Sequence, residues 1–267
     1  MPTVWPPHAA PEHGRRTTVQ GGRGGAGYAV SVAAATQANR LLAQFPEEAC
    51  RPWADHLETV DMRLGDVLHE PGCRVSHVYF PATGIVSLVH VLENGALAEI
   101  AAVGNEGLVG ISAFMGGNST PNQSVVRAAG RGLRLPVAVL VHAFERGGPV
   151  AQLLLRYTQA LMTQMSQTAV CNRHHSLDQQ LCRLLLFSLD RQHTLELWMT
   201  QELIANMLGV RREGVTAAAG KLQKLGVISY QRGQITVLDR PRLEALCCEC
   251  YAVVKKETDR LLPHLRD

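Results

Sequence analysis

The sequence lacks a long apolar run: no segment approaches the roughly 18–20 apolar residues that a membrane-spanning helix needs, so we expect no membrane partner. It also lacks a secretory signal, because no apolar core follows Arg15 and Arg16. Its seven cysteines are odd in number and scattered, unlike those of a secreted disulfide scaffold. These absences predict a cytoplasmic protein with reduced thiols. The formal net charge of +3 is too small to indicate a nucleic-acid partner by itself.

The composition is that of a globular chain, with 46% hydrophobic residues in a length of 267, enough for one large or two medium domains. Residues 1–36 are predicted to form a disordered tail, because the glycine-rich run at 21–25 supports neither helix nor strand. Residues 39–59 show helical periodicity that Pro46 should interrupt.

Short apolar runs divided by turn residues follow from Val60 to Pro136. Two of them, 85–89 and 97–103, flank Asn94-Gly95, which is a strong hairpin signal because both positions of such a turn favour positive φ. Short strands with frequent turns are typical of a sandwich, barrel or jelly roll. We therefore predict an α+β chain in which residues 37–148 form a jelly roll (double-stranded β-helix).

A long helix is predicted over residues 149–174, because Pro149 suits a helix start and apolar residues recur at coiled-coil spacing. We assign one seam of this helix to dimerisation, namely Val150, Leu154, Tyr157, Leu161 and Thr168. The alternative is that this seam packs on the chain's own sheet. A second stripe consists of Leu155, Thr158, Met162, Met165 and Ala169.

Residues 175–250 carry the most informative pattern, a helix-turn-helix counted from Gln201. Such a motif needs a small residue where its helices cross, a glycine at the turn and a β-branched residue in the core. Ala205, Gly209 and Val215 occupy these three positions. Two strands joined at Arg232-Gly233 follow and complete a winged helix. Residues 251–267 are predicted to be a C-terminal extension.

Basic residues concentrate in this region: residues 203–242 hold seven Lys or Arg against two acidic residues. Such clustering supplies the attraction to phosphates on which DNA binding depends. The second helix should enter the major groove N-terminus first, where Arg212 can contact guanine and Glu213 can contact cytosine. Thr200, Gln201, Lys221 and Arg232 would contact phosphates and sugars. The full predicted DNA-binding set is Thr200, Gln201, Arg211, Arg212, Glu213, Thr216, Lys221 and Arg232.

A jelly roll, a long helix and a C-terminal winged helix, in this order, resemble the Crp/Fnr family of bacterial transcription regulators over about residues 39–250. The most specific stretch is GVRREGV at 209–215, which is similar to the family's recognition-helix entry, where an Arg-Glu pair contacts bases. The stretch VYFPATG at 78–84 also resembles a common β-roll segment. The resemblance implies a homodimer that binds an inverted repeat in double-stranded DNA and contacts RNA polymerase.

The sequence departs from the family's cyclic-nucleotide site. Members that bind cyclic nucleotides carry a Phe-Gly-Glu cassette and then Arg-Ser or Arg-Thr, whereas this chain has LVGIS at 108–112 and NQS at 122–124. The arginine that pairs with the cyclic phosphate is missing, so the usual binding of cyclic AMP is not expected. The resemblance implies a degenerate, cyclic-nucleotide-binding-like pocket at Leu108, Gly110, Ser112, Gln123 and Ser124. An unknown small-molecule effector would bind there, unless DNA binding is constitutive. Ala217 stands where some members have a further base-contacting arginine, so the DNA site should differ from theirs.

No metal and no cofactor are predicted. Cys247, Cys248 and Cys250 are dense, but adjacent cysteines on a predicted helix make a poor cage, and His174 and His175 would point to different faces. A redox-, haem- or metal-responsive regulator of the same fold stays an alternative, as does a sensor module that acts through protein contacts. An enzyme built on the jelly roll is disfavoured, because the sequence contains no His-x-His metal-ligand pair.

Overall fold

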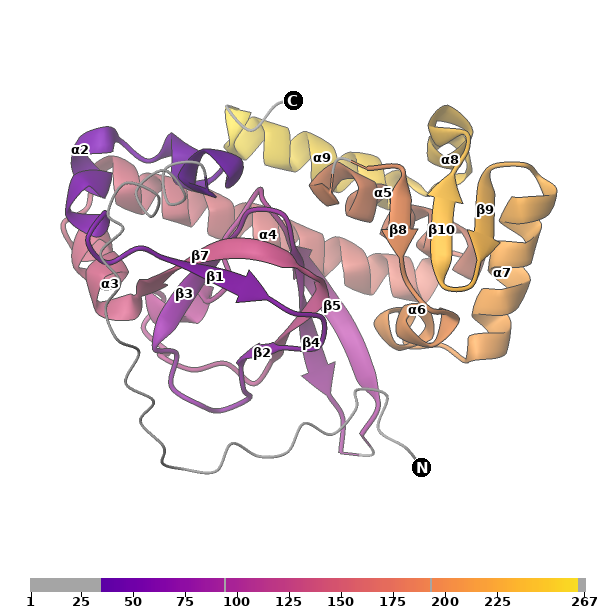
Figure 1. The fold of residues 1–267 in the computed structure, drawn as a ribbon, viewed down its shortest axis with the longest axis horizontal. Coiled ribbons are helices and arrows are strands. Elements are labelled where there is room, and N and C mark those ends of the chain that lie inside the picture. Colours follow the sequence, from indigo (N-terminus) through magenta and orange to yellow (C-terminus); the bar gives the residue numbers. More distant parts are fainter. Residues whose placement is uncertain (1–34, 94, 193, 264–267) are drawn as a thin grey trace, which may run out of the picture.

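The computed structural model describes residues 35–263 except residues 94 and 193 (Figure 1). A β-roll occupies one end, a long helix runs along it, and a helical C-terminal half with a small sheet occupies the other end. Nearly all of the predicted tail at 1–36 lies outside the described residues. None of the described helices is both long enough and apolar enough to cross a bilayer.

The β-roll is built from two antiparallel sheets, with strand orders β1-β7-β3 and β2-β6-β4-β5. Its strands are β1 (Glu58–Met62), β2 (Val67–His69), β3 (His77–Pro81), β4 (Ile85–Val91), β5 (Leu97–Val103), β6 (Gln123–Ala128) and β7 (Gly130–Pro136). Short helical pieces precede β1 in the described part of the chain, among them η1 (Leu42–Gln44), α2 (Glu47–Cys50) and η2 (Arg51–Trp53), and η3 (Ile111–Ala113) follows β5. Pro46 stands at the break between η1 and α2, as predicted.

Two local predictions in the β-roll are confirmed. Strands β4 and β5 pair in antiparallel register, and the turn between them contains Gly95 with φ of +81°, so the predicted hairpin is present. Strand β7 ends at Pro136, where the β module was expected to end. Phe80, Leu133 and Leu135 are fully buried between the sheets and form part of one core.

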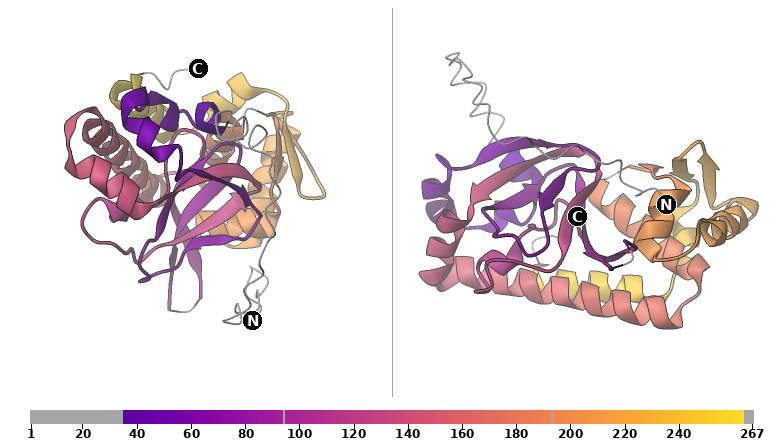
Figure 2. Two further views of the ribbon diagram at one scale, coloured as in Figure 1. Left: turned by 60° about the vertical axis from the view of Figure 1, so that its left-hand side comes forward. Right: turned by 90° about the horizontal axis from the view of Figure 1, so that it is seen from below.

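Two helices connect the β-roll to the C-terminal half. After α3 (Val137–Glu145) the chain turns through Gly147 and Gly148, with φ of +71° and +70°, a conformation that suits residues without a Cβ atom. It then enters α4 (Gly148–His174), which matches the predicted long helix and runs alongside the β-roll toward the C-terminal half (Figure 2).

The seam of α4 that we assigned to dimerisation is buried within the single chain. The exposed fractions of its side chains lie between 0% and 9% for Val150, Leu154, Tyr157, Leu161 and Thr168. Tyr157 donates a hydrogen bond of 2.8 Å to the carbonyl oxygen of Leu108, and Leu154 and Leu161 belong to the β-roll core. The dimerisation assignment is therefore wrong, and the alternative of packing on the chain's own sheet is correct. Periodicity could not decide this, because both stripes of the helix are apolar.

The C-terminal half has its own core and its own sheet, of strand order β8-β10-β9. Its elements are α5 (Leu177–Gln192), β8 (Glu196–Trp198), α6 (Gln201–Leu208), α7 (Arg212–Lys224), β9 (Ile228–Gln231), β10 (Gln234–Val237), α8 (Arg240–Leu246) and α9 (Glu249–Leu261). The two strands predicted around Arg232-Gly233 are β9 and β10, and β8 adds a third that the sequence did not indicate.

Helix α9 ties the two halves together. It crosses the predicted boundary at 250 and runs back alongside α4 (Figure 2). At its end, Leu261 and Leu262 pack into the core of the β-roll. Residues 251–262 are therefore an integral part of the fold rather than an appendage.

Candidate DNA-binding site and neighbouring sites

The helix-turn-helix is formed by α6 and α7, and the three residues that predicted it hold its crossing. Ala205 on α6 is 5% exposed and Val215 on α7 is fully buried. Gly209 ends α6 with φ of +65°, in the left-handed region that disfavours residues with a Cβ atom. Thr200 caps α6, because its side chain accepts a hydrogen bond of 3.1 Å from the amide of Leu203. These local constraints fix the angle at which α7 is presented.

The start of α7 is an exposed polar surface. Arg211 is the N-cap of α7, and Arg211, Arg212, Glu213 and Thr216 are all exposed. The Gln201 side-chain oxygen accepts hydrogen bonds from Thr216 at 2.8 Å and from Arg212 Nε at 3.5 Å. The first residue of α6 thus positions the side chains that lead the second helix. The partial positive charge of a helix N-terminus adds to the two arginines and favours a polyanion.

The other predicted DNA-binding residues lie at two separate places. Arg232 occupies the tip of the β9–β10 turn with φ of +49°, followed by Gly233 with φ of +82°, so the wing presents an exposed cation. Lys221 lies in the last turn of α7 and forms an ion pair of 2.8 Å with Asp178 of α5. A phosphate contact by Lys221 would have to compete with this pair.

The five residues predicted for an effector pocket are buried or half-buried, and several of them contact neighbouring side chains of the β-roll. Leu108 is fully buried in the core and Ser124 is 2% exposed, with its hydroxyl 3.4 Å from Nδ1 of His69. A Cβ atom on Gly110 would come within 3.0 Å of that same ring. Gln123 reaches outward and donates to Glu70, while Ser112 is partly buried. The imidazole of His69 thus lies against two of the five predicted residues, Gly110 and Ser124.

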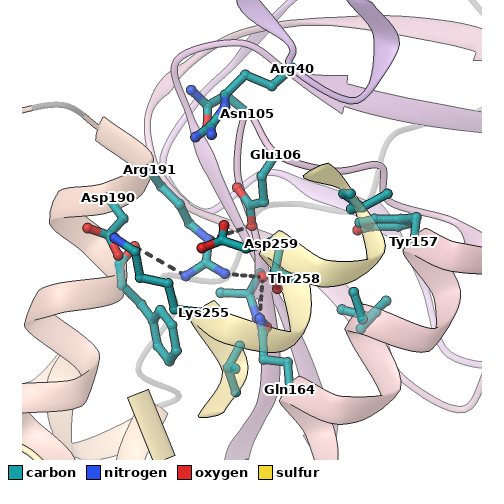
Figure 3. Close-up of a pocket in the computed structure, with 16 residues that line it drawn as sticks. Arg40, Asn105, Glu106, Tyr157, Gln164, Asp190, Arg191, Lys255, Thr258 and Asp259 are labelled. Carbon is teal, nitrogen blue, oxygen red and sulfur yellow. Dashed lines mark hydrogen bonds and ion pairs between the residues drawn. The ribbon is translucent and has the colours of Figure 1, made fainter. Parts of the chain in front are cut away.

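A cavity of about 350 Å³ lies elsewhere, where the β-roll, α4, α5 and α9 meet (Figure 3). None of the five predicted residues lines it. Its inner wall carries Arg191, which forms an ion pair of 2.7 Å with Glu106 and donates to the carbonyl oxygen of Ala102. Lys255 and Asp259 approach from α9 on the opposite side. The cavity thus combines charges of both signs, and no sequence pattern indicated it.

A buried arginine of the β-roll, Arg127, reaches the helices of the C-terminal half. Arg127 of β6 is 2% exposed and lies 3.2 Å from Glu99 of β5. The same guanidinium donates to Ser188 of α5 at 3.1 Å and contacts the sulfur of Met207 in α6 at 3.3 Å. Burial lowers the pKa of Arg127, while Glu99 favours its charged form. One side chain therefore connects the sensor-like half directly to the first helix of the DNA-binding motif.

Four metal-ligating side chains also converge in the structure, namely Cys171, His175, Cys248 and Cys250. The expectation that the cysteines at 247–250 lie on one helix is wrong: α8 ends at Leu246 and α9 begins at Glu249, so the chain bends between them. No sequence signal could have found the group, because its two halves are 77 residues apart.

Comparisons with known proteins agree with this geometry. Residues 179–246 match the model of the Crp-like helix-turn-helix domain. The chain is 24% identical to the global nitrogen regulator of Nostoc sp. over 212 residues, which cover 76% of this chain and 94% of that relative. Its fold is similar to a Crp/Fnr-family transcriptional regulator of Eubacterium rectale, with a TM-score of 0.63 and 21% identity over 79% of this chain and 98% of the other. The fold is also similar to that of FixK2 of Bradyrhizobium japonicum, with a TM-score of 0.61 and 18% identity over 72% of this chain and 98% of FixK2.

A β-roll joined to a winged helix with an exposed recognition helix defines a DNA-binding transcription regulator. Residues 179–246 match the Crp-like helix-turn-helix domain family, and the chain as a whole has the fold of Crp/Fnr-family regulators. The match to a Crp-like helix-turn-helix domain and the likeness to a nitrogen regulator favour a transcription regulator over the alternative of a jelly-roll enzyme.

Proposed function

We propose that the protein regulates transcription as a homodimer that binds an inverted-repeat DNA site, with one α7 helix in each of two successive major grooves. The observation that carries the proposal is the start of α7, where Arg211, Arg212, Glu213 and Thr216 are exposed together above a rigid turn. The N-terminal residues of a recognition helix are those that reach base edges in this motif.

Individual roles follow from side-chain chemistry. Arg212 can contact O6 and N7 of guanine with two hydrogen bonds, and Glu213 can accept a hydrogen bond from N4 of cytosine. Gln201 would orient Arg212 and Thr216, because it already accepts hydrogen bonds from both. Phosphates and sugars would be contacted by Arg232 at the wing tip, Thr200, Arg211 and Lys221. To do so, Lys221 would release its ion pair with Asp178 and pair with a phosphate instead.

The dimer would form through the outward stripe of α4 rather than through the buried seam. Leu155 and Met162 are 55% and 57% exposed, and exposed Ala169 continues their spacing of seven residues. A repeat of seven keeps one face of a helix against a two-fold partner. Val170, 44% exposed, lies beside this stripe near the end of the helix. We expect such a dimer to work in the cytoplasm beside the chromosome and to contact RNA polymerase.

Selection of bound sequences from random duplex DNA tests this function. Purified protein should enrich an inverted repeat with half-site centres about one helical turn apart. In a gel-shift assay on that site, Arg212→Ala should lose about 1–3 kcal/mol, or roughly 5- to 150-fold in affinity, and should relax the preference at one base pair. Arg74→Ala removes an exposed arginine from the β-roll and is the matched control. An equal loss in both variants would contradict the assigned role.

We further propose that a small polar effector binds in the cavity between α9 and the β-roll. The cavity supports this because it offers Arg191 and Lys255 next to Glu106 and Asp259, and because α5 forms part of its wall and leads to the helix-turn-helix. A thermal-shift screen of charged metabolites tests the idea. Thr258→Trp, which fills the cavity, should abolish a stabilising hit, whereas Val253→Trp, a residue of α9 that does not line it, should not. Full affinity for DNA without any hit would instead favour constitutive binding.

A further inference from the structure

Two pairs of potential metal ligands meet where the end of α4 touches the start of α9. Cys171 lies in the last turn of α4, and His175, four residues further on, is the C-cap of this helix and donates its amide to the Cys171 carbonyl oxygen. Cys248 is the N-cap of α9 and Cys250 lies in its first turn. Their four ligand atoms all lie within 4.8 Å of one another. A space of this size suits a single ion and is too small for a cluster of several irons and sulfides.

Two of the distances between these ligand atoms match those of a tetrahedral zinc site. With Zn–S bonds of about 2.3 Å and Zn–N bonds of about 2.0–2.1 Å, tetrahedral geometry places two sulfurs about 3.8 Å apart and a sulfur and a nitrogen about 3.6 Å apart. The Sγ atoms of Cys171 and Cys248 are 3.6 Å apart, and Sγ of Cys250 is 3.4 Å from Nδ1 of His175. Both values fall within the tolerance of about 0.2 Å that is reasonable for such a site.

The surroundings of the histidine are those of a metal ligand. Its Nδ1 faces the thiols, whereas its Nε2 lies 3.3 Å from a carboxylate oxygen of Glu249. A carboxylate on the far nitrogen is the usual partner of a metal-bound imidazole, because it fixes the ring and makes it a better donor. Gln180 donates to the backbone carbonyl of His175 at 2.9 Å and to that of Cys171 at 3.4 Å. The backbone that carries two of the four groups is thereby held in place.

A cation bound here would have to displace the thiol protons, and Arg183 would offset the charge of the resulting thiolates. All three cysteines are buried, and burial raises the pKa of Cys171 to about 12 and that of Cys250 to about 11. Both thiols therefore keep their protons at neutral pH unless a metal ion displaces them. Arg183 acts in the opposite direction and lowers both pKa values. Three thiolates around Zn²⁺ leave a net charge of −1, which this buried arginine would compensate.

We propose that Cys171, His175, Cys248 and Cys250 bind one Zn²⁺ ion in a closed tetrahedral site. Four protein ligands and no open position make the site structural rather than catalytic. The ion clamps the start of α9 to the end of α4, and α9 in turn packs into the β-roll core. Because α5 begins at Leu177, two residues after His175, the clamp also fixes the point at which the DNA-binding half leaves α4. The site goes beyond the proposed function, and its presence does not depend on DNA binding.

Metal analysis of the full-length protein tests the site directly. After purification under reducing conditions, elemental analysis should find one zinc per chain. Cys171→Ser, Cys248→Ser and Cys250→Ser should each lose it, and His175→Ala should weaken its retention against a chelator. Cys73→Ser and His174→Ala change exposed residues outside the group and should keep the zinc of the wild type. Zinc loss in the controls, or wild-type zinc in the cysteine variants, would overturn the assignment.

A second measurement needs no variant and so does not depend on mutant folding. Wild-type protein stripped of metal is titrated with Co²⁺, and a tetrahedral complex should give visible d–d absorption and thiolate-to-cobalt charge transfer that saturate at one equivalent. Subsequent Zn²⁺ should bleach both signals. An octahedral spectrum, no saturable absorption, iron with inorganic sulfide in the purified protein, or a Cys171–Cys248 disulfide under reducing conditions would each refute the proposal.

Discussion

Replacing Leu155 and Met162 by alanine should separate the dimer without unfolding the chain. Fully burying such a side chain is worth about 1.5–3 kcal/mol. Each side chain is just over half exposed in the single chain, so burying the remainder in a dimer can contribute about half of that free energy. Alanine keeps one carbon of each side chain, so each substitution loses about 1 kcal/mol of dimerisation free energy. A symmetric dimer contains four substituted sites, two in each protomer. The total of about 4 kcal/mol weakens dimerisation about a thousandfold.

Sedimentation equilibrium over a range of protein concentrations measures this change. Alanine is the best helix former, so α4 should stay intact, and circular dichroism with a thermal scan checks that it does. Leu64→Ala is the matched control, because Leu64 is 57% exposed, like Met162, but lies in the β-roll away from α4. The double variant should also bind a single half-site about as well as the wild type while losing cooperative binding to the inverted repeat.

Two results would refute the reasoning. An unchanged dimer constant in the double variant would show that the outward stripe of α4 is not the interface. A loss of the same size in the Leu64→Ala control would show that the assay reports general destabilisation. By contrast, substitutions in the buried seam, such as Leu154→Ala, should lower the free energy of unfolding of each chain, because they leave a cavity.

Three further predictions concern stability. Arg127→Met leaves Glu99 without its cation and should lower the free energy of unfolding in urea by about 3–5 kcal/mol. Arg134→Met breaks an exposed ion pair and should lower it by at most about 1 kcal/mol. Equal losses would contradict the buried-pair argument. Gly209→Val forces a β-branched residue to φ of +65° and should cost about 1–2 kcal/mol, whereas Gly209→Asn should cost less, and the reverse order would argue against a strained turn. Burial lowers the pKa of His69 below 6.5, so near this pH the folded state binds fewer protons than the unfolded state. The contribution of neutral His69 to the free energy of unfolding should therefore be fully present above pH 6.5 and should be lost as the pH falls below it. A His69→Asn variant should flatten that slope in urea titrations at several pH values, and an unchanged slope would assign it to other groups.

Locally encoded features were predictable from the sequence. The spacing of Ala205, Gly209 and Val215 defines the helix-turn-helix. The helix crossing requires a small residue, the turn requires a glycine with positive φ, and the core requires a β-branched residue. The hairpin at Gly95 and the end of the β module at Pro136 follow in the same way from what glycine and proline allow the backbone to do. The exposed arginines at the start of α7 could be named for the same reason, since helix periodicity separates them from the buried positions.

Features that depend on which surfaces meet were decided only by the tertiary structure. Helix α4 has two apolar stripes of similar strength, and only packing against the β-roll shows which residues are covered. The stripe with Leu154 is buried, whereas in the second stripe Leu155, Met162 and Ala169 are exposed but Thr158 is buried. The polar cavity draws its walls from the β-roll, α4, α5 and α9, so no single segment carries its pattern. Cys171 and Cys248 meet because α9 folds back along α4. A sequence specifies each residue's local preference, whereas a site shared by distant segments exists only once burial of the apolar faces has brought those segments together.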